Sequence, residues 1–194
     1  MAQDMSISEE IYTHKYLWRA ADLMLKEAKT NKERSPSFIL SALHMSYMAF
    51  EAFINFCGFV LFPEFWTDEK KIFKGRGGGI EAKISKIRKR LTDFDWQNGK
   101  KLYQSVRELK DFRDLVSHGK VIASTYKAIP QEDGSHIKWE HPWDMFISIE
   151  KAESSMRDIK SFCQALLEAM RKRSDHPHVF FNAFEGPRAS AEGR

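Results

Sequence analysis

The segment 108–120 of the sequence contains the three side chains best suited to chemistry, Arg113, Asp114 and His118. The spacing around them predicts an amphipathic helix, which turns by about 100° per residue and places Arg113 within its apolar stripe. A guanidinium cannot lose its proton, so on a stripe meant for burial it needs a carboxylate, a phosphate or a wet cleft beside it. We therefore expect an anionic group to face Arg113. The apolar stripe consists of Leu102, Val106, Leu109 and Val116.

His118 is followed by Gly119, a residue type that commonly closes the last turn of a helix. The histidine is therefore expected at the negative end of the helix dipole, which favours the imidazolium form and suits a residue that gives and takes a proton. Asp114 lies one turn earlier on the same side, where it can orient the ring. The three residues would form a phosphate clamp, an orienting carboxylate and a proton shuttle. The alternative is a chance spacing in an ordinary helix, with Arg113 paired to a neighbouring acidic side chain.

Two further groups of residues are candidates for supporting roles. Glu51 and Asn55 fall on a polar edge of the preceding long helix, where Glu51 is a candidate partner for Arg113 or an aid in positioning His118. A purely structural ion pair between Glu51 and Arg113 is the favoured alternative. Ser117, next to the histidine, is also a candidate supporting residue. The basic residues proposed to follow an RNA backbone are Lys83, Lys86, Arg90 and Lys120, and the alternative for such a basic flank is an ordinary solvated surface.

Length and composition favour a single cytoplasmic domain. The 194 residues, 42% of them hydrophobic, are enough for one core, and a net charge of +4 permits nucleic acid binding without requiring it. Cys57 and Cys163 lie among apolar residues, which is typical of free thiols in a reducing compartment. The apolar run 52–62 is followed by Pro63 and falls short of the roughly 20 residues that span a bilayer, so we expect no membrane anchor.

Helical periodicity dominates the chain and predicts an all-α fold, a bundle of about five helices with a peripheral β-hairpin after the fourth long helix. Residues 1–173 are expected to form the helical domain, and 174–194 a C-terminal tail that is loosely ordered or docks on the body. The first helix is expected to open with a capping box at Ser6 and Glu9, and the last with a cap at Ser148. The helices are expected at about 6–32, 38–61, 80–91, 95–118 and 149–173, and the hairpin strands at 121–128 and 136–140.

The second of these helices is expected to direct one stripe of side chains into the core. That stripe is Met45, Ala49, Ala52, Phe56 and Val60.

No metal or cofactor is expected. His176 and His178 make only half of a metal site, and the sequence contains neither the serine elbow of hydrolases nor the paired histidines of zinc proteases. Cys57 and Cys163 have no evident activating neighbour, so we do not expect either to be a nucleophile. The remaining candidates for chemistry are the side chains around Arg113.

The run Arg113-Asp114-Leu115-Val116-Ser117-His118, at the end of a late helix in a mainly helical chain, resembles the HEPN superfamily (higher eukaryotes and prokaryotes nucleotide-binding domain). The hallmark of that family is an arginine, often followed by a polar residue, and a histidine after an intervening stretch of four to six residues. The segment 46–55 also resembles the family's helix that precedes the motif helix. The resemblance covers about residues 7–173.

The resemblance implies a metal-independent endoribonuclease of the kind used in toxin-antitoxin, phage-defence and RNA-processing systems. His118 would then be the acid and base that helps the ribose 2′-hydroxyl attack the adjacent phosphodiester, Arg113 would hold the phosphate, and Asp114 would orient the pair. Such sites usually form in a homodimer where two motif helices meet, and a protein inhibitor or antitoxin is a possible further partner.

The chain departs from the family at one position and leaves an alternative open. In the branch regulated by a nucleotidyltransferase antitoxin a tyrosine lies two residues after the histidine, where this chain has Lys120. This difference puts that partner in doubt. Other members of the family have lost catalysis and serve as RNA-binding or dimerising modules, which is the alternative function for this chain.

Overall fold

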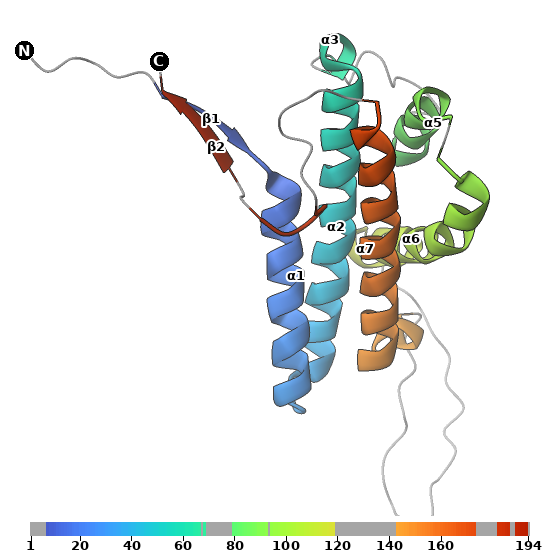
Figure 1. Cartoon of the computed structure of the whole chain (residues 1–194). Coiled ribbons are helices and arrows are strands. Elements are labelled where there is room, and N and C mark those ends of the chain that lie inside the picture. The colour runs from blue at the N-terminus through green and yellow to red at the C-terminus, as the bar shows by residue number, and fades with distance from the viewer. Residues whose placement is uncertain are drawn as a thin grey trace, which may run out of the picture.

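The structure is a computed structural model that describes residues 7–66, 68, 79–92, 94–118, 143–173, 182–186 and 189–193. The described chain is mostly helical, which confirms the prediction of a helical bundle (Figure 1). The predicted hairpin at 121–128 and 136–140 lies outside the described residues. The elements are β1 (Ile7–Ile11), α1 (Thr13–Thr30), α2 (Ser35–Leu61), α3 (Pro63–Trp66), α5 (Ile80–Arg90), α6 (Trp96–Ser117), a 3-10 turn (Asp144–Phe146), α7 (Ile149–Arg171) and β2 (Ala189–Gly193).

Helix α2 is the centre of the bundle. Helix α1 packs along it, α7 packs against both α2 and α6, and α5 packs against α2. Figure 1 shows α1, α2 and α7 side by side, with α6 crossing them at a steep angle. The core contains large side chains from three of these helices, which are fully or almost fully buried: Tyr47, Phe50, Phe53, Leu109, Phe112, Ile159, Phe162 and Leu166.

The predicted core stripe of α2 was only partly right. Ala49 and Val60 are buried, but Met45, Ala52 and Phe56 are only half-buried. Helix α2 is apolar on nearly every side, so the spacing of its apolar residues does not identify the face that packs inward. Part of the face that was expected to lie in the core is therefore accessible to solvent.

The length and hydropathy of α2 would also allow it to cross a membrane. Its most apolar window has a mean hydropathy of 1.3, and 50% of that window is buried inside the fold. A core helix of a soluble protein has the same length and composition, so these two properties are weak grounds for a membrane span.

The first helix begins later than its capping box predicted. Glu9 lies in β1, which pairs antiparallel with β2 from Ile7 opposite Gly193 to Ile11 opposite Ala189. The prediction of a helix from Ser6 was therefore wrong, because the partner strand is almost the whole chain away and local spacing cannot reveal it. Figure 1 shows this two-stranded ribbon projecting from the top of α1.

The last helix begins as predicted. The hydroxyl oxygen of Ser148 accepts a hydrogen bond from the backbone N–H of Lys151 at 3.1 Å, which caps α7. Residues 182–186, from the predicted tail, lie on the bundle. There Phe184 is 4% exposed and stacks on Trp18 with ring centroids 4.2 Å apart. This part of the C-terminal segment therefore belongs to the core.

Candidate functional site

Helices α2 and α6 bring Arg113 against Glu51. The two residues are 62 positions apart in the sequence, yet Nη2 of Arg113 donates a hydrogen bond to Oε1 of Glu51 at 3.0 Å. The side chains are 23% and 35% exposed, respectively, so the pair lies at the edge of the core within reach of solvent. The anionic group expected to face Arg113 is therefore this carboxylate.

A second carboxylate holds the other terminal nitrogen of the guanidinium. Nη1 of Arg113 lies 2.9 Å from Oδ1 of Asp114, and Oδ2 of Asp114 accepts a hydrogen bond from Nζ of Lys110 at 2.7 Å. Glu51, Arg113, Asp114 and Lys110 thus form a continuous chain of alternating charges. Lys110 was not expected in this network, although its spacing of four residues from Asp114 is the usual one for an ion pair on a helix.

Tyr47 completes the surroundings of Arg113 and was not predicted. Its ring is fully buried, and the guanidinium carbon of Arg113 lies 5.0 Å from the ring centroid, within the range of a cation–π contact. Nε of Arg113 is buried without a hydrogen bond to any described residue. The buried Tyr47 hydroxyl is close enough to Arg113 and Glu51 for both residues to affect its pKa. On sequence alone Tyr47 is an ordinary core aromatic, and its only signal is its position one turn before Glu51.

The charges of the network shift the pKa values of its members. Burial opposes ionisation of Asp114, but Lys110 and Arg113, with a smaller contribution from His118, lower the pKa of its carboxyl. Burial would likewise lower the pKa of Arg113, but Glu51, Tyr47 and Asp114 outweigh it and raise that pKa. The arginine and aspartate are thus held as ions.

His118 lies at the exposed end of α6, as expected. Its backbone N–H donates to the carbonyl oxygen of Asp114 at 3.1 Å, which continues the helical pattern to the histidine. The imidazole is exposed, and it is close enough to Asp114 to affect the pKa of that carboxyl. Ser117 is exposed beside it and has no described role in the network. The three predicted chemical residues therefore share one end of α6.

The predicted RNA-binding residues of α5 do not form one exposed row. Lys83 is only 8% exposed and donates from Nζ to Oδ1 of Asn55 at 2.6 Å, so this predicted supporting residue contacts Lys83. Nζ of Lys86 lies 5.2 Å from the ring centroid of Phe62. Arg90 is exposed at the end of the helix. The fourth predicted residue, Lys120, lies outside the described residues.

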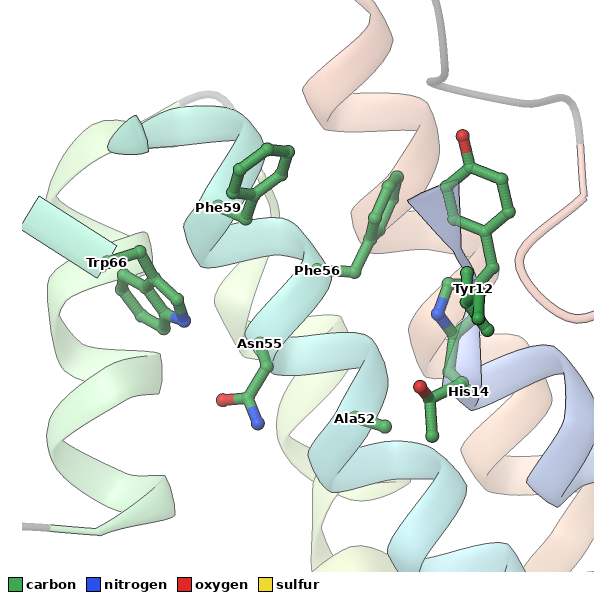
Figure 2. A pocket seen from close by; sticks show the side chains of 9 residues that line it. Tyr12, His14, Ala52, Asn55, Phe56, Phe59 and Trp66 are labelled. Atoms are coloured by element: carbon green, nitrogen blue, oxygen red, sulfur yellow. The ribbon is translucent and has the colours of Figure 1, made fainter. Parts of the chain in front are cut away.

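A cavity of about 470 Å³ is lined in part by Asn55. This cavity was not predicted from the sequence. Figure 2 shows aromatic side chains projecting into it from both sides of α2. Its walls come from segments that are separated in the chain, which explains why no local motif signals it. The lining residues are Ile11, Tyr12, Thr13, His14, Ala52, Asn55, Phe56, Phe59 and Trp66.

Cysteine and metal chemistry receive no support from the described residues. Cys57 and Cys163 are buried free thiols, and burial raises the pKa of both, which disfavours the reactive thiolate. Within the described ranges no group of three or more histidine, cysteine or acidic side chains is placed to hold a metal ion.

Comparisons with known protein families, with curated proteins and with solved structures find no match to this chain. Among the described residues, the side chains around Arg113 and His118 are the best placed for chemistry. The C-terminal end of α6 carries a fixed cation, a fixed anion and an exposed imidazole, those of Arg113, Asp114 and His118. Such a set can bind a phosphate and transfer a proton beside it.

Proposed function

We propose that this protein is a metal-independent endoribonuclease of the HEPN type, acting in the cytoplasm. The observation that carries the proposal is the Arg113–Asp114 pair, joined at 2.9 Å and lying one helical turn from the exposed imidazole of His118. His118 would remove the proton of a ribose 2′-hydroxyl while that oxygen attacks the adjacent phosphorus. The P–O5′ bond breaks, the 5′-oxygen takes up a proton, and the other product ends in a 2′,3′-cyclic phosphate.

Arg113 would stabilise the negative charge that develops on the phosphate oxygens, and Asp114 would orient both partners. His118 lies five positions after Arg113, which corresponds to about 7.5 Å along the helix and about 140° around it. Side chains that diverge in this way reach a common phosphate more readily when two copies of α6 meet. A homodimer through α6 therefore belongs to the proposal.

The alternative is an RNA-binding or dimerising module without catalysis, and one observation favours it. Both terminal nitrogens of Arg113 are already engaged by carboxylates, Glu51 at 3.0 Å and Asp114 at 2.9 Å. A cation neutralised in this way must release a partner before it holds a phosphate. In that alternative the ion pairs maintain the packing of α2 against α6 and RNA binds without being cut.

Cleavage of mixed RNAs in the presence of EDTA tests the proposal. We expect cleavage by the wild-type protein, and a loss of at least about a hundredfold in His118→Ala, because general acid–base groups contribute about that much or more. Arg113→Ala should be similarly impaired. His44→Ala, which changes a half-buried histidine elsewhere on α2, is the matched control and should cleave normally. Cleavage that persists in His118→Ala would contradict the assignment of the site.

The biological setting that the resemblance implies is defence, a toxin-antitoxin pair or RNA processing. A protein inhibitor or antitoxin would be a natural partner in the first two settings, because unrestrained RNA cleavage harms the cell that makes the enzyme. Purification of the chain with its neighbouring gene product would test for such a partner.

A further inference from the structure

The cavity on the outward face of α2 has features that RNA cleavage chemistry does not use. Its volume of about 470 Å³ lies within the usual range for small-molecule sites, about 300–1,000 Å³. Phe56 and Phe59 project into it from α2 (Figure 2). Trp66 forms one wall, and Tyr12 and His14 form the opposite one. We call this cavity the α2 groove.

The Trp66 wall is built into the fold. The indole is only 8% exposed and lies directly over Gly58 of α2, where the Cβ of any other residue would overlap the ring. Glycine is thus the residue type that allows this close approach. This wall of the groove is therefore pre-formed, which lowers the cost of ordering it when a ligand binds.

Asn55 supplies a directed polar group at the edge of the groove. A lysine ammonium can only donate hydrogen bonds, so the Asn55 atom that lies 2.6 Å from Nζ of Lys83 is the amide oxygen. Figure 2 shows the amide nitrogen turned to the other side, away from α5. The Nδ2 hydrogens can therefore be donated to a carbonyl or ring nitrogen of a ligand.

The electrostatics of the groove favour an uncharged planar ligand with an anion nearby. Burial, together with the neighbouring Lys15, lowers the pKa of His14 to about 3, so the imidazole in the wall is neutral. None of the described residues that line the groove carries a carboxylate. The ammonium group of Lys83 contacts the amide oxygen of Asn55 at the edge of the groove. An apolar, aromatic space with a cation at its edge suits a heteroaromatic ring attached to a phosphate.

The groove is adjacent to the candidate site of cleavage. Asn55 lies one turn along α2 from Glu51, the carboxylate that holds Arg113, and one turn of helix rises about 5.4 Å. This spacing along α2 would allow a strand that places a phosphate at Arg113 to enter the α2 groove at its Asn55 edge. The two sites can be occupied by consecutive parts of one strand.

We propose that the α2 groove holds an unpaired base of single-stranded RNA whose backbone phosphate lies at Arg113, an inference that rests on the proposed function. Every base has a π-face that stacks on aromatic side chains, here Phe56, Phe59 or Trp66, and only an unpaired base can leave its neighbours to do so. The Asn55 amide donates to the edge of that base. The groove therefore selects single strands over duplexes.

Equilibrium binding of short RNAs in a His118→Ala background, which prevents cleavage, tests the proposal. Three ligands are compared: a single-stranded oligoribonucleotide, the same strand with abasic riboses at its centre, and its duplex. Phe59→Ala removes a side chain that is 39% exposed, and Leu23→Ala on α1, where Leu23 is 46% exposed, is the matched control. Asn55→Asp keeps an oxygen for Lys83 and removes the amide donors.

We expect Phe59→Ala to weaken binding of the single strand by about 5- to 150-fold, the usual effect of removing a base-stacking side chain. Leu23→Ala should leave it unchanged, and Asn55→Asp should weaken it. The abasic strand should bind the parent and Phe59→Ala equally. Duplex RNA should bind less tightly than the single strand.

Three results would overturn the proposal: equal affinity of Phe59→Ala and its parent for the single strand, absence of RNA binding, or loss of self-association in Phe59→Ala with RNA affinity intact. The last result would show that a second copy of the chain covers the groove. The wild-type cleavage assay separates this inference from the proposed function. If RNA binds through Phe59 but is not cut, the proposed endoribonuclease function is refuted and the groove proposal stands. If RNA is cut but Phe59→Ala binds it as tightly as the parent does, only the groove proposal is refuted.

Discussion

Replacing Glu51 with glutamine tests whether Arg113 is a phosphate ligand or only a structural cation. The Glu51 carboxylate competes with any phosphate for Nη2 of Arg113, which it contacts at 3.0 Å. Glutamine has nearly the same shape and keeps an acceptor oxygen, but it removes the negative charge. If Arg113 binds RNA, Glu51→Gln should therefore bind RNA more tightly than the wild-type protein.

The size of the effect follows from the exposure of the pair. With side chains 23% and 35% exposed, the pair is screened by solvent, and such ion pairs contribute about 0–1 kcal/mol. A gain of about 1 kcal/mol corresponds to roughly a fivefold lower Kd. The free energy of unfolding should fall by no more than about 1 kcal/mol for the same reason.

The assay is fluorescence anisotropy of a labelled single-stranded RNA in the His118→Ala background, at one fixed salt concentration because phosphate contacts depend strongly on salt. Glu153→Gln is the matched control. It also raises the net charge by one and breaks an exposed ion pair, that of Glu153 with Lys29 at 2.5 Å. If Glu51→Gln binds RNA no more tightly than Glu153→Gln, Arg113 is not the phosphate ligand and the pair is structural.

Three further changes test the fold around the site. Gly58→Ala should lower the free energy of unfolding by about 1–3 kcal/mol in urea titrations, because its Cβ would overlap the Trp66 indole. Phe184→Ala should lower it by about 3 kcal/mol, since the ring is 4% exposed and stacks on Trp18. His14 has a pKa lowered to about 3, so the free energy of unfolding of the wild-type protein should fall by about 1.4 kcal/mol for each pH unit below about pH 6.5. His14→Gln should remove this loss.

The sign of the pH effect follows from linkage. The unfolded chain takes up a proton on His14 below its ordinary pKa of 6.5, whereas the folded protein does not until about pH 3, so acid favours unfolding. The unfolding free energies of the wild-type protein and His14→Gln should be compared between about pH 6.5 and 5, where ordinary carboxyl groups are still ionised. Parallel pH profiles of the wild-type protein and His14→Gln would contradict the buried neutral state. Met145→Ala, at a side chain 73% exposed, is the control for Gly58→Ala and Phe184→Ala and should change stability by less than about 0.5 kcal/mol.

The parts of the fold that local chemistry determines could be predicted from the sequence. The cap at Ser148 was correct because a hydroxyl at that position satisfies a backbone N–H of its own helix at 3.1 Å. The contact of Glu51 with Arg113 was one of the expected alternatives, because a guanidinium on an apolar stripe needs a nearby anion.

The parts that depend on distant partners could not be predicted. Lys83 seemed to belong to an exposed basic flank, yet it donates to Asn55, 28 positions earlier in the chain. The strand β1 is stabilised by residues 189–193, and the aromatic partner Tyr47 resembles any other core residue until α6 is placed beside it. Helix α2 gave no directional signal because it is apolar on nearly all sides. The α2 groove was not predicted because its walls also come from segments that are separated in the chain.

The chemical identity of the RNA ends produced by the protein tests the central claim most directly. Wild-type protein incubated with a single-stranded RNA in EDTA should give fragments that end in a 2′,3′-cyclic phosphate, as detected by mass spectrometry, and His118→Ala should give none. This result is expected because His118 activates the 2′-hydroxyl without a metal ion. Intact RNA after incubation with folded wild-type protein, or the same cyclic ends from His118→Ala, would contradict the account.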